Sequence, residues 1–205
     1  MNVQDFQNGL DKMFPNPKCE LKYETDFQLL IAVILSAQCT DKRVNIVTEK
    51  LFCQYKSPQD FANAKIEDLE ECIKPCGLQK NKAKAIVNAS KMICERFDGV
   101  VPNDFNELMQ LTGVGRKVAN VMMSEAFKQD AFAVDTHVLR VSNRLKFVKT
   151  QNPTECELKL KSIFPKDCWS KLHFQMVLFG RYICRAKNPD CKNCEFYGEC
   201  EYKKE

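Results

Sequence analysis

Apolar residues recur every three or four positions along most of this chain of 205 residues. Near the N-terminus, Val3, Phe6 and Leu10 fall on one helical face, and later groups of apolar residues repeat the spacing. Such a period is typical of amphipathic helices, whereas half-buried strands alternate every second residue. No long alternating segment is present in the sequence. The sequence therefore predicts an all-α protein built from many short helices.

The longest apolar run covers residues 29–35 and is far shorter than the roughly 18 residues that suggest a membrane span. We interpret it as a helix buried on most sides. Turn-forming residues separate the helical segments, and no repeat, low-complexity tract or flexible linker divides the chain. If there are two domains, we expect the chain to cross between them more than once.

The composition narrows the class of protein only slightly. Apolar residues make up 44% of the chain and charged residues 28%, which is typical of a soluble globular protein. The formal net charge of +4 permits an anionic partner such as nucleic acid but does not require one. The N-terminus lacks the basic and apolar regions of a secretory signal, so we expect a cytoplasmic protein with reduced cysteines.

Four of the 12 cysteines are crowded near the C-terminus and form the strongest single signal in the chain. Six, two and five residues separate, in turn, Cys184, Cys191, Cys194 and Cys200. Four thiolates in so short a segment can enclose one metal centre, either a zinc ion or a [4Fe–4S] cluster. Four-cysteine zinc sites more often use two Cys-x-x-Cys pairs, and here there is one. Ligation would hold together a loop that is too irregular to bury much apolar surface.

Two of the seven glycines lie close together in the segment Leu111-Thr-Gly-Val-Gly-Arg-Lys117. Gly113 and Gly115 are expected to flank a tight turn, with one helix ending near Leu111 and the next beginning near Val114. The first amides of a helix lack internal partners and suit a phosphate. A turn of this kind can hold a DNA backbone without reading bases.

A polar stripe is predicted on the helix after this turn, opposite its valines, and is formed by Lys117, Asn120, Ser124 and Lys128. A lysine on a polar face is most often only solvated, but a neutral lysine can also act as a nucleophile. About one helix later, Asp135 precedes an apolar periodic segment, where we expect it to cap a helix. A capping aspartate stays ionised and is held rigidly, so it can also serve in catalysis.

The segments Leu111-Thr-Gly-Val-Gly-Arg-Lys-Val-Ala-Asn120 and Val134-Asp-Thr-His-Val-Leu-Arg140 resemble motifs of the helix-hairpin-helix DNA glycosylases, and those of the endonuclease III family most closely. The resemblance implies that Lys117 attacks C1′ of a damaged nucleotide, expels the base and forms a Schiff base, after which β-elimination nicks the strand. It implies that Asp135 helps to activate the lysine and stabilises the cationic sugar. Thr112 stands where the family usually has proline, which leaves the turn less rigid.

The resemblance also bears on the cofactor and on contacts with the DNA backbone. The spacing of the four cysteines matches the iron–sulfur loop of the endonuclease III family, which favours a [4Fe–4S] cluster over zinc. In that family the loop meets the DNA backbone, so Arg185 and Lys187 are candidate phosphate contacts. Gly113, Gly115 and Arg116 are the corresponding candidates at the hairpin. For each basic residue, ordinary solvated charge is the alternative.

Two further segments resemble the loops with which this family opens the duplex. In Ser36-Ala-Gln-Cys-Thr-Asp41, the resemblance places Gln38 in the gap left by the extruded nucleotide, facing the orphaned base. In Pro75-Cys-Gly-Leu-Gln-Lys-Asn-Lys-Ala83, it makes Leu78 an apolar wedge. Taken alone, Gln38 could be a polar residue at a helix end, and Leu78 could be a small contact with the core.

The resemblance covers nearly the whole chain and implies two all-α domains with DNA in the cleft between them. Residues 21–132 would form a six-helix domain with the hairpin, and residues 1–20 with 133–205 an iron–sulfur domain. The implied function is base-excision repair by a bifunctional DNA glycosylase and AP lyase that acts on oxidised pyrimidines. The alternatives are the same fold with a preference for pyrimidine dimers or mismatched adenine, and a non-catalytic iron–sulfur DNA-binding module. We expect a bacterial, nucleoid-associated monomer, whose partner is double-stranded DNA with a damaged base or abasic site, and no membrane partner.

Overall fold

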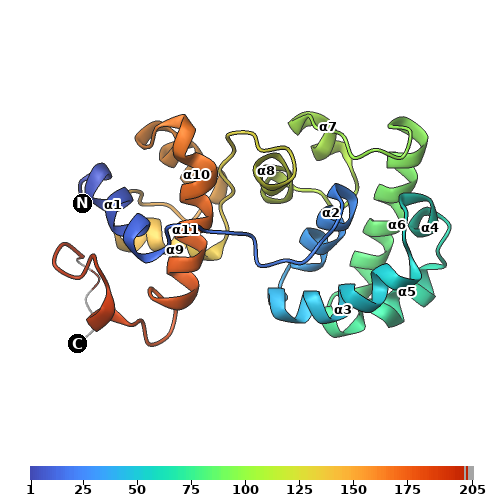
Figure 1. Ribbon diagram of the computed structural model, residues 1–205, viewed down its shortest axis with the longest axis horizontal. Coiled ribbons are helices and arrows are strands. Elements are labelled where there is room, and N and C mark those ends of the chain that lie inside the picture. Colours follow the sequence, from blue (N-terminus) through green and yellow to red (C-terminus); the bar gives the residue numbers. More distant parts are fainter. Residues whose placement is uncertain (201, 203–205) are drawn as a thin grey trace. The chain divides into compact units, whose positions relative to one another are not determined.

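The computed structural model describes residues 1–200 and 202. These residues form eleven α-helices and three short 3-10 helices and contain no strand (Figure 1), which confirms the all-α prediction. The α-helices are α1 (Val3–Met13), α2 (Asp26–Leu35), α3 (Asp41–Gln54), α4 (Pro58–Ala62), α5 (Ile66–Ile73), α6 (Gln79–Arg96), α7 (Phe105–Gln110), α8 (Arg116–Glu125), α9 (Thr136–Arg144), α10 (Pro153–Ile163) and α11 (Trp169–Tyr182). The 3-10 helices are η1 (Lys74–Cys76), η2 (Lys166–Cys168) and η3 (Cys191–Asn193). Among the described helices, none has the length and apolar character needed to cross a membrane.

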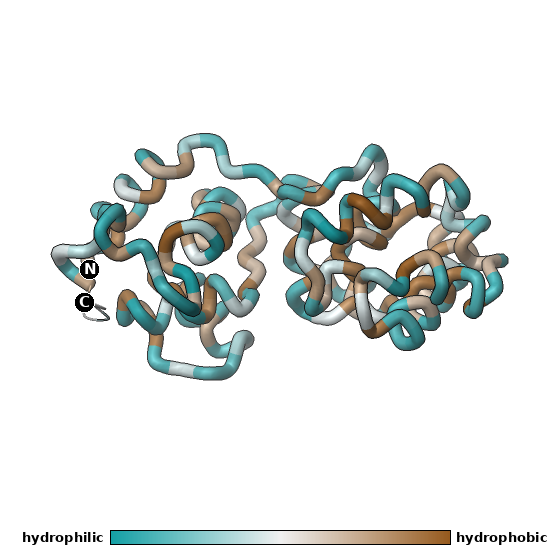
Figure 2. The backbone as a smooth tube through the Cα atoms, turned by 90° about the horizontal axis from the view of Figure 1, so that it is seen from below, coloured by the Kyte–Doolittle hydropathy of each residue, from teal (hydrophilic) through white to brown (hydrophobic). Residues whose placement is uncertain are grey.

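The chain divides into two compact units. The central unit is Cys19–Phe127, and the terminal unit joins Met1–Lys18 to Lys128–Glu205. In both units apolar and polar residues follow one another in short blocks along the helices (Figure 2), as the predicted periodicity requires. The chain therefore leaves the terminal unit once, after its first helix, and returns to it.

The central unit is organised around α2 and α6. Every residue from 29 to 35 in α2 is buried, which confirms the prediction of a helix covered on most sides. Thr25 caps this helix by accepting a hydrogen bond from the Gln28 amide at 3.2 Å. The long helix α6 packs against α4 and α5 (Figure 1), and the rings of Phe27 and Phe61 meet edge to face with centroids 5.5 Å apart. These contacts form the core of the central unit.

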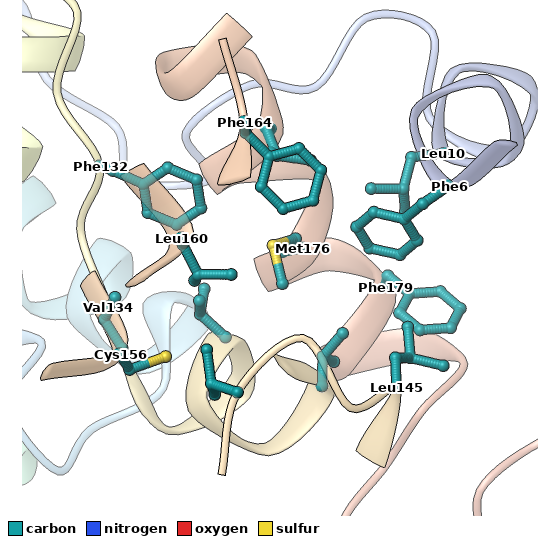
Figure 3. Close-up of a cluster of buried hydrophobic side chains, with 14 of the residues drawn as sticks. Phe6, Leu10, Phe132, Val134, Leu145, Cys156, Leu160, Phe164, Met176 and Phe179 are labelled. Atoms are coloured by element: carbon teal, nitrogen blue, oxygen red, sulfur yellow. The ribbon is translucent and has the colours of Figure 1, made fainter. Parts of the chain in front are cut away.

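The terminal unit buries side chains from α1, α9, α10 and α11 in one apolar core (Figure 3). The fully buried ring of Phe6 lies with its centroid 4.9 Å from that of Phe196, so the first helix packs against the C-terminal loop. A second link is polar, because the buried Gln175 side chain donates to Asp11 Oδ1 at 2.7 Å and to the Phe14 carbonyl at 3.0 Å. These contacts tie the two ends of the sequence into one unit.

Candidate functional site

The glycine pair forms a tight turn between α7 and α8. Gly113 has a φ of +83°, which glycine adopts without steric cost, and a Cβ at this position would lie 2.7 Å from the Ala85 Cβ. The Val114 amide donates to the Leu111 carbonyl at 3.0 Å and closes the turn. Gly115 lies in the extended region and is the N-cap of α8. Close packing against α6 therefore requires the first glycine of the pair.

Two sequence predictions for this region are wrong in detail. The helix begins at Arg116, two residues after Val114, because Gly113 in the left-handed region and Gly115 in the extended region keep Val114 in the turn. The polar stripe is not a solvated face, since Asn120 is 2% exposed and Ser124 is 4% exposed. Each can be buried because its side chain donates to a backbone carbonyl of its own helix, at 3.1 and 3.2 Å. Lys128 lies beyond the end of α8.

Lys117 occupies the second position of α8 and its side chain is exposed. Gly115 provides no side-chain cap for this helix, and the first amides of a helix suit an anionic ligand. The neighbouring Arg116 is half-buried, and its guanidinium carbon lies 5.3 Å from the centre of the Phe105 ring. The hairpin thus combines an exposed amine with helix-start amides within one turn.

Asp135 is the N-cap of α9, as the sequence predicted. Its Oδ1 accepts hydrogen bonds from the amides of His137 and Val138, both at 2.8 Å. The side chain is half-buried, and the cap engages only one of its two carboxylate oxygens. Asp135 belongs to the terminal unit and Lys117 to the central unit. Helix capping therefore fixes the carboxylate rigidly in its own unit.

The two candidate wedge residues share an unusual backbone conformation. Gln38 lies between α2 and α3 with a φ of +54°, and Leu78 precedes α6 with a φ of +53°. Both side chains are exposed, and Leu78 retains 48% of its accessible surface. A residue with a side chain rarely adopts this left-handed conformation, so such residues concentrate at functional sites. Both candidates belong to the central unit.

The four clustered cysteines line one cavity in the terminal unit, together with Phe179, Ile183 and Tyr197 among others. Burial, together with the three neighbouring thiols, raises the pKa of Cys194 to about 11. In the described residues, no group of three His, Cys, Asp or Glu side chains is arranged around the position of a single metal ion.

Two arginines of α9 that are not among the predicted site residues hold the start of this cysteine loop. Arg140 donates to the carbonyls of Cys184 at 3.0 Å and Gly180 at 2.6 Å. Arg144 donates to the Arg185 carbonyl at 2.8 Å and to the Cys184 Sγ at 3.4 Å. The spacing of four residues between the two arginines was the available signal, because it places both on one face of a helix.

The candidate basic residues of the loop differ in their settings. The exposed Arg185 folds back on its own loop and donates from Nε and Nη2 to the Asn188 carbonyl at 3.1 and 2.9 Å. Lys187 lies between Arg185 and Asn188 in the sequence, and its side chain is exposed. The guanidinium of Arg185 is thus held in place by the backbone, whereas the ammonium of Lys187 is a surface charge.

Comparisons with known proteins identify the family. A family model described as "HhH-GPD superfamily base excision DNA repair protein" matches residues 31–166. The endonuclease III of Bacillus subtilis (strain 168) is 47% identical over 204 residues, which cover 98% of this chain and 93% of that protein. A solved non-covalent endonuclease III–DNA complex aligns with 46% identity and a TM-score of 0.94, over 97% of this chain and 94% of that chain. A trapped endonuclease III–DNA covalent intermediate aligns with the same identity and TM-score, and the alignment covers 98% of this chain and 96% of that chain. This chain belongs to the HhH-GPD superfamily of base excision DNA repair proteins and, within it, to the endonuclease III family.

Proposed function

We propose that this chain removes oxidised pyrimidines from duplex DNA and nicks the strand, with Lys117 as the nucleophile. By family membership the chain is a bifunctional DNA glycosylase and AP lyase of base excision repair. The observation that carries the residue assignment is the exposed amine of Lys117 in the first turn of α8, directly after the glycine turn. A similar endonuclease III has been trapped as a covalent intermediate with DNA, which is the outcome expected of a nucleophilic amine.

In the proposed reaction the neutral amine of Lys117 attacks C1′ of the damaged nucleotide. The new C–N bond forms as the bond to the base breaks, the base leaves with the bonding electrons, and the nitrogen gives up a proton. Opening of the sugar yields the Schiff base. Loss of a proton from C2′ then expels the 3′ phosphate by β-elimination. A covalent route divides one difficult substitution into easier steps.

Asp135 is proposed to assist this reaction as a fixed carboxylate. Its cap to α9 holds one oxygen, so the side chain keeps its orientation without a further partner. A carboxylate held in advance stabilises the positive charge that develops on the sugar, and it can accept a proton from the attacking amine. The amides and glycines of the hairpin, with Arg116, would hold the DNA backbone, and Gln38 and Leu78 would occupy the space of the extruded nucleotide.

Cys184, Cys191, Cys194 and Cys200 are proposed to hold a [4Fe–4S] cluster. Support comes from their common cavity, from the apolar and aromatic groups that line it, and from the Arg144 guanidinium that donates to the Cys184 sulfur. When bound, the cluster supplies cross-linking of the loop rather than a reactive group. Arg185 and Lys187 would then face the DNA backbone from this loop.

The direct test is covalent trapping with borohydride on duplex DNA that carries one abasic site. The wild-type protein should form a stable adduct, Lys117→Gln should form none, and Lys91→Gln, at an exposed lysine of α6, should match the wild type. A panel of duplexes with single defined lesions should show excision of oxidised pyrimidines in preference to pyrimidine dimers and mismatched adenine. An adduct of undiminished yield in Lys117→Gln would overturn the assignment of the nucleophile.

A further inference from the structure

Lys82 is a buried lysine of α6 that the proposed reaction does not use. Its side chain is only 5% exposed, and burial lowers the pKa of its ammonium group. The Nζ atom donates hydrogen bonds to the backbone carbonyls of Leu35 and Cys76, both at 2.9 Å. A buried charge is costly unless its hydrogen-bonding capacity is used, so a lysine in this place calls for a function.

The two carbonyls come from the two segments that carry the wedge residues. Leu35 is the last residue of α2, three positions before Gln38, and Cys76 ends η1, two positions before Leu78. The backbone amide of Lys82 also donates to the Leu78 carbonyl at 3.0 Å. One residue therefore contacts the chain at the start of both loops and at one of the wedge residues itself.

The backbone around Leu35 shows why a side-chain donor is needed there. After α2, the Ala37 amide donates to the Ile34 carbonyl and the Cys39 amide donates to that of Ser36. The Leu35 carbonyl, which lies between Ile34 and Ser36 in the sequence, accepts its hydrogen bond from Lys82 Nζ. The last carbonyls of a helix need partners outside it, and here the partner is a charge from a different helix.

Both wedge residues lie in the left-handed region, where a side chain is strained. Such conformations persist only when the surrounding structure imposes them, and both wedge side chains are themselves exposed. The ammonium of Lys82 anchors the two loops to one point, so their relative position cannot change without breaking a buried, charge-assisted hydrogen bond.

We propose that Lys82 is a positioning residue for duplex opening, which ties the Gln38 and Leu78 loops together so that both side chains enter the DNA as one unit. This inference rests on the proposed function for the roles of Gln38 and Leu78. It assigns to Lys82 no contact with DNA and no part in the chemistry at Lys117. Loss of the tie should therefore impair extrusion of the nucleotide and leave the nucleophile intact.

The test compares Lys82→Met with Lys91→Met, an exposed lysine on the same helix. Methionine matches the four-atom stem of lysine and lacks only the ammonium group, so it cannot donate to the carbonyls. Single-turnover excision of an oxidised pyrimidine from duplex DNA should fall by about 10- to 100-fold in Lys82→Met, since small misplacements are costly. Borohydride trapping on single-stranded abasic DNA, which needs no extrusion, should stay within about twofold. Lys91→Met should match the wild type in both.

A second readout requires no chemistry. In a duplex with a tetrahydrofuran abasic analogue opposite 2-aminopurine, the fluorescence of the 2-aminopurine should rise when wild-type protein unstacks this base, and Lys82→Met should reduce the rise.

A third experiment removes both wedge side chains. In a Gln38→Ala, Leu78→Ala background, Lys82→Met should lower duplex excision by less than about twofold, because the residues act as a unit. Equal losses on single-stranded and duplex substrates, or an unchanged 2-aminopurine signal, would overturn the role of Lys82. The proposed chemistry can fail independently. If the wild-type protein forms no adduct but its 2-aminopurine response still depends on Lys82, only the chemistry proposed for Lys117 is refuted.

Discussion

The hairpin turn and the cysteine loop are both proposed to contact DNA, yet different forces hold them. The turn after α7 buries Leu111 and Val114 and packs Gly113 against Ala85. In residues 184–200, all of which the structure describes, Phe196 alone is buried. Backbone conformation and apolar packing are therefore sufficient to shape the turn. The loop is held at its start by the arginines of α9 and packs through Phe196, and we expect its four thiols to supply the rest through the proposed cluster.

The largest expected effect is the loss of the cysteine loop in Cys194→Ser. A serine hydroxyl is a poor substitute for a thiolate ligand. This loop also has little apolar packing that could stabilise it without the ligand. We expect loss of bound iron and of visible absorbance, with amide hydrogen exchange in residues 184–200 faster by on the order of 100-fold. Exchange in the central unit should stay the same.

Cys168→Ser is the matched control, because Cys168 belongs to the same unit but lies outside the cluster and donates to the Pro165 carbonyl, as serine can. Retention of both iron and protection in Cys194→Ser would mean that packing, not ligation, holds the loop. The contrast with the hairpin turn would then disappear.

Gly113→Ala should have the next largest effect. A methyl group there must adopt a φ of +83° and would meet the Ala85 Cβ at 2.7 Å. Backbone strain and overpacking together predict a loss of about 2–4 kcal/mol in the free energy of unfolding, measured with urea. Gly115 has a φ of −94°, and a Cβ added there would meet no atom within 4 Å apart from its chain neighbours. In Gly115→Ala the loss in the free energy of unfolding should therefore stay below about 1 kcal/mol. Equal losses would show that the turn tolerates a side chain.

Asp135 allows folding to be separated from chemistry at a single residue. Asparagine caps a helix as well as aspartate does, so Asp135→Asn should change the free energy of unfolding by less than about 0.5 kcal/mol, whereas Asp135→Ala should lose about 1 kcal/mol. Both variants remove the carboxylate and should reduce excision by about 100-fold or more. Full activity in Asp135→Asn would assign the residue to capping alone.

The smallest effect concerns the ion pair between Asp11 and Lys171, which joins α1 to α11 at 2.6 Å. Hydrogen bonds from Lys171 and then from Gln175 lower the pKa of Asp11 from its usual 3.8. A carboxyl whose folded pKa is depressed stabilises the protein above its unfolded pKa and loses this effect as the pH falls through the folded value. Asp11→Asn should therefore cost less than about 1 kcal/mol near pH 7, since the pair is exposed. In acid titrations of stability the difference should shrink as the pH falls below 3.8 and be lost once Asp11 is protonated in the folded protein. If the stability difference persists at acid pH, the amide introduced by Asp11→Asn must destabilise the protein through its shape and not through the lost charge.

The helical class and the capping role of Asp135 could be predicted because they depend on local patterns. The start of α8 was misplaced because Val114 continues the apolar spacing of the helix, while the conformation of Gly113 keeps it in the turn. Asn120 and Ser124 count as polar in any sequence pattern. Their hydrogen bonds to their own helix make them buried residues in three dimensions.

Lys82 and the arginines of α9 show where sequence reasoning stops. Lys82 reads as one basic residue among several in α6, and nothing in its neighbours reveals that its partners are carbonyls 47 and 6 positions away. Arg140 and Arg144 likewise act on a segment 40 or more positions along the chain. Contacts of this kind arise from the tertiary fold, so a periodic pattern cannot encode them.

The most direct measurement for the central claim is to map the trapped adduct by mass spectrometry after borohydride reduction and proteolysis. The account predicts that the sugar remnant is attached to Nζ of Lys117, in the peptide that begins α8. Attachment to another amine, such as Lys128 or the N-terminus of Met1, in a protein that still excises oxidised pyrimidines would contradict it.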